Sequence, residues 1–176
     1  MSRTRIHLLR AVNVGGAKLP MAELKELATE LGATDVSTYI ASGNLICTPP
    51  GDPAEFDRAL EQAVEKRYGF FREVISRSRP EVRAALDAHP FEIIQPRYSY
   101  VSFLLAEPTA AAIEKALTFP TGDDAWQVIG RELHIRYAGG AGRPQMKDAQ
   151  IGKALGVPGT ARNLRTVQAL IDLARS

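Results

Sequence analysis

The chain has 176 residues, of which 45% are hydrophobic and 24% charged, and its formal net charge at pH 7 is +2. These values are typical of a globular protein, and so small a net charge excludes an overall field that would attract nucleic acid or membranes. The N-terminal residues form no apolar signal segment, and no stretch approaches the ~20 apolar residues of a membrane span. We therefore predict a cytoplasmic protein without a membrane partner.

Two local features refine this description. Residues 131–176 carry eight Lys or Arg and three Asp or Glu, and such a basic region either contacts an anionic partner or forms a solvated face. The single cysteine, Cys47, excludes an intramolecular disulfide and fits a reducing compartment. Its apolar neighbours predict that the thiol is buried.

The first 76 residues predict the element order β-α-β-β-α-β. Apolar residues from Met21 to Leu31 follow the helical period, Pro20 favours a helix start, and Gly32 favours its end. This order is typical of ferredoxin-like folds, in which two helices cover one face of an antiparallel sheet. The expected elements are strand 6–9, helix 20–31, strands 36–40 and 45–47, helix 53–68 and strand 71–75.

The second half predicts a similar plan in the order α-β-α-β-β-α-α. Alternation along strand 133–137 places His134 on the solvent side. The fold class is therefore α+β with two ferredoxin-like halves, an N-terminal subdomain 1–78 and a C-terminal subdomain 79–176. The expected elements of the second half are helix 80–88, strand 98–105, helix 109–117, a hairpin 126–137, helix 149–155 and a final helix capped by Thr160.

Three ordered motifs resemble a widespread bacterial family of unknown function. LLRAVNVGG (8–16), TYIASGN (38–44) and TARNLRTV (160–167) are similar to the family's LLRGINVGG, TYIQSGN and TxRNWxTV. The resemblance implies a two-part α+β architecture with ferredoxin-like halves, and it implies no established activity. Ala11, Ala41 and Leu164 stand where the family usually has Gly, Gln and Trp, so a site built on that amide or indole would be missing here.

The first candidate site is the loop that follows the first strand. A strand–Gly-Gly–helix junction presents backbone N–H groups and a positive helix end, which favours a small anionic or phosphate-bearing ligand. The alternative is that the glycines supply only the turn, and that the asparagine satisfies the loop backbone. The residues concerned are Arg10, Asn13, Gly15, Gly16 and Lys18.

The second candidate site is the turn formed by Tyr39, Ser42, Gly43 and Asn44. If strand ends converge, this turn completes one polar pocket with the first loop. The alternative is a plain hairpin turn in which Gly43 and Asn44 take left-handed conformations.

The third candidate is Arg162 with Asn163, expected in the first turn of the last helix, where an anion is favoured. Together with Arg143, Lys147 and Arg165 they form a basic region that could contact a nucleic-acid backbone. The alternative is that this pair holds the terminal helix to the rest of the protein.

No residue set predicts catalysis, a metal or a cofactor. His7 is the only histidine near Ser42 in sequence, and strand geometry does not bring the two together. The three histidines lie far apart, without cysteine or carboxylate at ligand spacing. Three hypotheses remain: a small anionic ligand at the two N-terminal loops, nucleic-acid binding by the basic C-terminal third, or oligomerisation through open strand edges.

Overall fold

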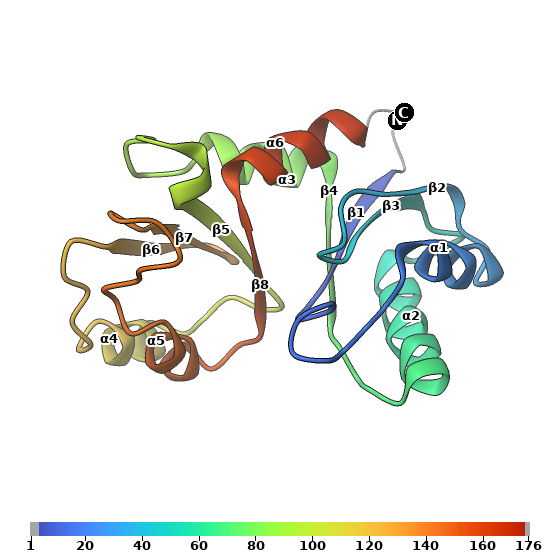
Figure 1. The fold of residues 1–176 in the computed structure, drawn as a ribbon, viewed down its shortest axis with the longest axis horizontal. Helices are drawn as coiled ribbons and strands as arrows, with labels where there is room; N and C mark the ends of the chain where they lie inside the picture. The colour runs from blue at the N-terminus through green and yellow to red at the C-terminus, as the bar shows by residue number, and fades with distance from the viewer. Residues whose placement is uncertain (1–3, 175–176) are drawn as a thin grey trace. The chain divides into compact units, whose positions relative to one another are not determined.

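The computed structural model describes residues 4–174, which divide into two compact units (Figure 1). The N-terminal unit contains the residues up to Arg83 and those from Ala169 onward, and the C-terminal unit contains Ala84–Gln168. Within residues 4–174, every helix is too short or too polar to cross a bilayer.

The N-terminal unit is a four-stranded antiparallel sheet in the order β2-β3-β1-β4. Each strand–helix–strand connection skips one strand, which is the predicted ferredoxin-like arrangement. Figure 1 shows α1 and α2 on one face of this sheet. The elements are β1 (Arg5–Leu9), α1 (Met21–Glu30), β2 (Thr34–Thr38), β3 (Asn44–Thr48), α2 (Pro53–Tyr68) and β4 (Val74–Ser78).

The helices begin and end where the sequence predicts. Asp52 caps α2 by accepting a hydrogen bond from Glu55 N, and Gly69 ends the helix in the left-handed conformation, at φ +80°. Apolar faces of α1 and α2 pack on the sheet and form the core of the unit. The core includes Leu9, Val12, Leu19, Leu24, Leu27, Leu45, Cys47, Phe56, Leu60, Val64 and Val74.

A buried polar contact joins three elements of this unit. His7 on β1 is fully buried, and its Nδ1 lies 2.9 Å from Asp57 Oδ1 on α2. Ser76 on β4 donates a hydrogen bond to the other oxygen of the same carboxylate. Because a buried polar group without a partner is costly, this contact fixes α2 over the central strand β1 and the edge strand β4.

The C-terminal unit repeats the same topology, with the sheet order β6-β7-β5-β8 and all pairs antiparallel. Figure 1 shows α4 and α5 side by side next to this sheet. Its elements are β5 (Ser99–Leu104), α4 (Ala110–Ala116), β6 (Ala125–Ile129), β7 (Glu132–Arg136), α5 (Asp148–Leu155) and β8 (Gly159–Asn163). A short 3₁₀ turn (Pro96–Tyr98) precedes β5, and α3 (Arg79–Asp87) and α6 (Leu164–Leu173) each cross the division between the units.

The prediction for residues 159–163 was wrong. Thr160 does not cap the last helix, and Arg162 and Asn163 do not lie in its first turn, because all three belong to β8. Pairing with β5 supplies the backbone hydrogen bonds that this polar segment lacks on its own. The cap of α6 is Asn163, whose Oδ1 accepts a hydrogen bond from Thr166 N at 2.8 Å.

The free thiol of Cys47 is predicted to be inert in the native protein. It is fully buried, and burial, with a smaller contribution from the negative charge of Asp57, raises its pKa to about 12. Since the thiolate is the reactive form, the native chain should react with a disulfide reagent at pH 8 only as fast as it unfolds. The rate of colour release from a chromogenic disulfide reagent, measured with and without about 6 M guanidinium, compares the reactivity of the thiol in the unfolded and the native chain. Rapid labelling of the native chain would contradict it.

Candidate functional site

The side-chain amide of Asn13 is used entirely by loop backbone. Its Nδ2 donates to Leu19 O at 3.0 Å and to Ala41 O, and its Oδ1 accepts from Leu19 N at 2.8 Å. The bond to Ala41 brings the two N-terminal candidate loops side by side. With both amide hydrogens and the carbonyl engaged, Asn13 acts as a link between loops rather than as a donor to a ligand.

Asn44 has a similar role in the second loop. Its Nδ2 donates to Tyr39 O at 2.8 Å and to Ser42 Oγ at 2.9 Å, and Tyr39 N donates to its carbonyl. Gly43 is left-handed, at φ +85°, but Asn44 is the first residue of β3, so its expected left-handed conformation was wrong. Ile40, at φ +47°, takes the second positive-φ position instead.

Few hydrogen-bond donors in these two loops remain available to bind an anion. Arg10 pairs with Glu73, with 3.5 Å between Nη1 and Oε2. Gly15, Gly16 and Lys18 are exposed, and among residues 4–174 neither glycine N–H has a hydrogen-bond partner. The geometry therefore favours a mainly structural role for these loops, with two glycine amides and one lysine left accessible.

A more complete constellation lies in the C-terminal unit. A groove of about 470 Å³ forms at the end of the sheet where β5 starts and β8 ends, beside the loop that connects β7 to α5. Tyr100 and Asn163 are direct neighbours across β5 and β8, so their side chains share one face. The groove is lined by Arg97, Tyr98, Tyr100, Gly139, Gly140, Ala141, Gly142, Arg143 and Asn163.

The glycine-rich loop of the groove is anchored by a buried carboxylate. Asp124 accepts hydrogen bonds from Ala138 N at 2.8 Å, Gln145 N at 2.6 Å and Met146 N at 3.0 Å. Gly140, at φ +90°, packs so close to Tyr98 that a Cβ would lie 3.0 Å from the ring. No local sequence pattern around Asp124 predicts this role, because the loop that it anchors lies 14 to 22 residues away.

The loop leaves several donors open toward a ligand. Among residues 4–174, the backbone N–H groups of Gly139, Ala141 and Gly142 have no hydrogen-bond partner, and neither does the Arg143 guanidinium. Asn163 uses Oδ1 to cap α6, which leaves its Nδ2 as a further donor. None of the residues that line the groove is acidic. The groove is therefore rich in donors and positively charged.

Arg162 lies outside the groove and is buried. Its Nη1 donates to Thr160 Oγ1 at 2.6 Å and to Ala161 O at 2.9 Å, and burial lowers the pKa of the guanidinium to about 10. Of the predicted pair, only Asn163 therefore reaches the groove. Sequence analysis did not identify three further lining residues, Arg97, Tyr98 and Tyr100. They lie before and at the start of β5, far from Arg143 in the sequence.

A second polar cluster in this unit is a histidine pair. His134 is fully buried, and its Nδ1 lies 3.0 Å from His89 Nδ1, so the predicted solvent position of His134 was wrong. Alternation places His134 opposite the core residues Leu133 and Ile135, but that second face is also covered. Burial, with a smaller effect of His89, lowers the pKa of His134 to about 4. In residues 4–174, no three His, Cys, Asp or Glu side chains gather as a metal site.

Comparison with known proteins identifies the family. The sequence profile of a family described as "Protein of unknown function (DUF1697)" matches residues 1–134. The chain belongs to this family. The match confirms the resemblance to a family of unknown function, and a search among curated proteins gave no match.

One solved structure shares the fold of this DUF1697 member. The conserved bacterial protein SP0830 from Streptococcus pneumoniae aligns over 100% of both chains, with a TM-score of 0.77 and 21% sequence identity. At that identity the likeness concerns the fold alone. A "putative glycine cleavage system transcriptional repressor" aligns over 90% of this chain and 95% of its own, at 14% identity, but its TM-score of 0.24 describes no shared fold.

Replacement of Gly43 by alanine is predicted to destabilise the N-terminal unit. A Cβ there would lie 2.5 Å from Val12 Cγ2 and 3.1 Å from Leu9 O, at a positive φ. We expect a loss of roughly 2–4 kcal/mol in the free energy of unfolding. Gly15→Ala is the matched control, since its φ is also positive but its Cβ meets nothing within 4 Å; it should cost about 1 kcal/mol. Equal losses in urea denaturation would show that the close contact does not matter.

The histidine pair predicts a specific loss of stability in acid. The pKa of His134 is lower in the folded chain than its ordinary value of 6.5. At pH values between these two pKa values, the unfolded chain therefore binds more protons than the folded chain. Stability is then complete above pH 6.5 and is lost as the pH falls toward 4, by about 3 kcal/mol at most. The difference in unfolding free energy between pH 7 and pH 5 should be smaller in His134→Asn. An unchanged pH dependence would show that the pair does not contribute.

Proposed function

We propose that the C-terminal unit binds a nucleotide-like ligand, with a phosphate and a planar ring, in the groove between Arg97, Arg143 and Asn163. The observation that carries this proposal is the combination of two arginines, two tyrosines and three unpartnered loop N–H groups without any acidic residue in the lining. Its volume of about 470 Å³ falls within the range of small-molecule sites.

The phosphate would bind at the glycine-rich loop. Successive backbone N–H groups in such loops form a concave site for anions, and here Gly139, Ala141 and Gly142 provide them. The planar guanidinium of Arg143 can donate two parallel hydrogen bonds to a phosphate. Because Asp124 already holds the loop in place, little conformational entropy is lost on binding.

The ring would bind at the start of β5. The Arg97 guanidinium lies over the Tyr98 ring, 5.3 Å from its centroid, and so presents a flat, cationic surface on which a base can stack. Burial raises the pKa of Tyr100, which keeps its hydroxyl protonated and able to donate. Asn163 Nδ2 adds a donor on the same face. These groups suit a base edge with acceptor atoms.

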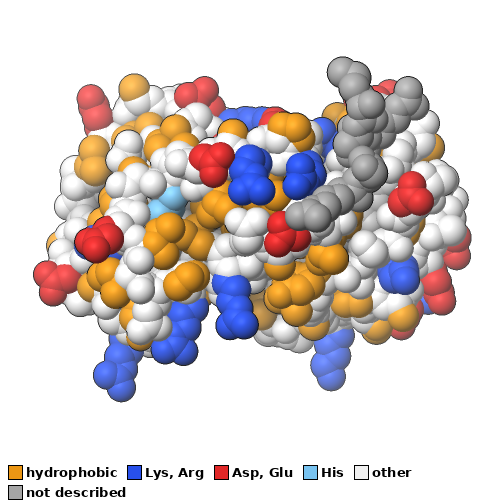
Figure 2. All heavy atoms as spheres, turned by 90° about the horizontal axis from the view of Figure 1, so that it is seen from above, with side chains coloured by type: hydrophobic (Ala, Val, Ile, Leu, Met, Phe, Trp, Pro, Cys, Tyr) orange, Lys and Arg blue, Asp and Glu red, His pale blue; other side chains and the backbone are white. Residues whose placement is uncertain are grey.

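The volume of the groove favours a local site over a broad nucleic-acid surface, and one face of the molecule bears no continuous basic surface. On the face shown in Figure 2, Lys and Arg side chains are interspersed with Asp and Glu. A continuous basic face would instead attract a long backbone through many phosphates. One or two nucleotides fit the groove better than an extended strand.

Titration calorimetry with AMP, UMP, inorganic phosphate and a 5′-phosphorylated RNA hexamer tests this proposal. We expect nucleotide binding that weakens tenfold or more in Arg143→Ala, with partial recovery in Arg143→Lys, which keeps the charge but not the fork. Lys18→Ala is the matched control in the N-terminal loops and should bind as the unaltered chain does.

Each other outcome has a defined meaning. Binding of the hexamer alone, with an affinity that falls steeply with salt, would favour the nucleic-acid alternative. Loss of binding in Lys18→Ala, with Arg143→Ala unaffected, would move the site to the Gly15-Gly16 loop. No heat with any of the probes would overturn the proposal. We place this activity in the cytoplasm, where a reducing environment suits a chain with one cysteine.

A further inference from the structure

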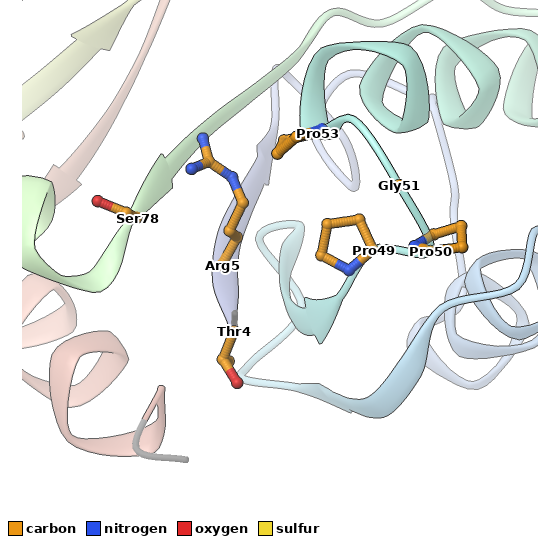
Figure 3. A pocket seen from close by; sticks show the side chains of 7 residues that line it. All are labelled: Thr4, Arg5, Pro49, Pro50, Gly51, Pro53 and Ser78. Carbon is orange, nitrogen blue, oxygen red and sulfur yellow. The ribbon is translucent and has the colours of Figure 1, made fainter. Parts of the chain in front are cut away.

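A second cavity lies within the N-terminal unit and is unlike the groove in chemistry. It has a volume of about 320 Å³ and is lined by three prolines (Pro49, Pro50 and Pro53), by Arg5, and by the hydroxyl residues Thr4 and Ser78. Figure 3 shows the Arg5 side chain on one side of this cavity and Pro49 and Pro50 on the other. All of these residues belong to one unit, so the cavity is complete within it.

The charge of Arg5 is poorly neutralised by the protein. Its Nη2 donates to Ser76 Oγ at 3.3 Å, its Nη1 lies 3.9 Å from Glu81 Oε1, and its Nε is buried without a hydrogen-bond partner. A buried donor left without a partner indicates a missing ligand or water.

The nearby carboxylates are engaged elsewhere. Glu81 Oε1 accepts a hydrogen bond from Ser78 N at 2.8 Å, and Glu81 N donates to Ser78 Oγ at 3.2 Å, so the two residues form a capping box for α3. Asp57 binds His7 and Ser76. Both carboxylates are shared with other donors, and Arg5 Nε has no hydrogen-bond partner, so the guanidinium retains the capacity to bind an outside anion.

The walls of the cavity limit what that anion can be. Proline rings are apolar and rigid and have no N–H, so the walls present packing surface and few donors. Pro53 is the first residue of α2, a helix of 16 residues whose start adds a partial positive charge. A phosphate needs several donors, as the glycine-rich loop of the other unit offers. One guanidinium among prolines suits a singly charged, planar carboxylate attached to a small apolar body.

The cavity lies at the place in its unit that corresponds to the groove in the other unit, so this comparison rests on the proposed function of the groove. The cavity lies at the start of β1, the connection from β3 to α2 and the end of β4. The groove lies at the start of β5, the connection from β7 to α5 and the end of β8, which are the equivalent places in the second unit. The last residues of β4 and β8 also match, because Ser78 caps α3 and Asn163 caps α6.

We infer that the Arg5 cavity is a second ligand site of this protein and binds a small organic carboxylate with an apolar body. The guanidinium pairs with the carboxylate, and Pro49, Pro50 and Pro53 pack against the body.

Calorimetric titration with isobutyrate and benzoate tests the inference, with benzamide as the neutral counterpart of benzoate and inorganic phosphate as a non-planar anion. We expect saturable binding of at least one carboxylate, and binding of benzamide and phosphate at least tenfold weaker. Arg5→Gln should weaken carboxylate binding tenfold or more. Arg143→Gln in the other unit should leave it unchanged.

A second variant keeps the test independent of the Arg5 contacts with Ser76 and Glu81. Gly51 also lines the cavity, and a Cβ there would meet nothing within 4 Å, so Gly51→Val should narrow the cavity without touching those contacts and should weaken binding tenfold or more. Equal binding of benzoate and benzamide, undiminished binding in Gly51→Val, or no saturable binding of either carboxylate would overturn the inference. None of these results bears on nucleotide binding, which Arg143 variants test separately.

Discussion

The central strand of each sheet is buried, and this constraint governs the rest of the structure. β1 and β5 each lie between two partner strands, and nearly all of their side chains are inaccessible to water. A polar atom buried there without a partner costs about 1–3 kcal/mol, a cost that Ser99 Oγ and His7 Nε2 still carry. His7 finds Asp57 on α2, which also binds Ser76 of β4. A single carboxylate thus links a helix to two strands.

Contacts within the sheet also explain several residues of the motifs that resemble the family. Two motif residues have structural roles at the strand ends. Asn13 links two loops through its side-chain amide, and Gly43 lacks the Cβ that would collide with Val12. Ala11, Asn13 and Ile40 hold positive φ angles at this end of the sheet, which costs energy for residues other than glycine. Asn13 and Gly43 are therefore explained by architecture, whereas the N–H groups of Gly15 and Gly16 in the first motif have no partner among residues 4–174.

Local patterns predicted most of the fold and little of the groove. Helical periodicity, Pro20 and Gly32 sufficed for α1, and Asp52 and Gly69 for α2, because these signals act within one turn. β8 was missed because the polar segment 159–163 becomes a strand only by pairing with β5. Alternation correctly separated His134 from the core side of β7, but a period of two cannot tell whether the second face is covered. Tyr98, Arg143 and Asn163 meet only through strand pairing and the anchoring of a loop by Asp124.

The two units share one topology but differ in the residues that line the equivalent cavities. The connection from the third strand to the second helix reads PPGD in the first unit, and in the second it is the longer YAGGAGRPQMK. Prolines remove backbone donors and leave Arg5 to act alone, whereas glycines expose N–H groups beside Arg143. The neighbouring strand ends supply the remaining walls in both cases. Under both proposals, the shared fold sets where a ligand would bind, and the composition of one loop sets which anion it would be, a division expected when function resides in sites carried on a common scaffold.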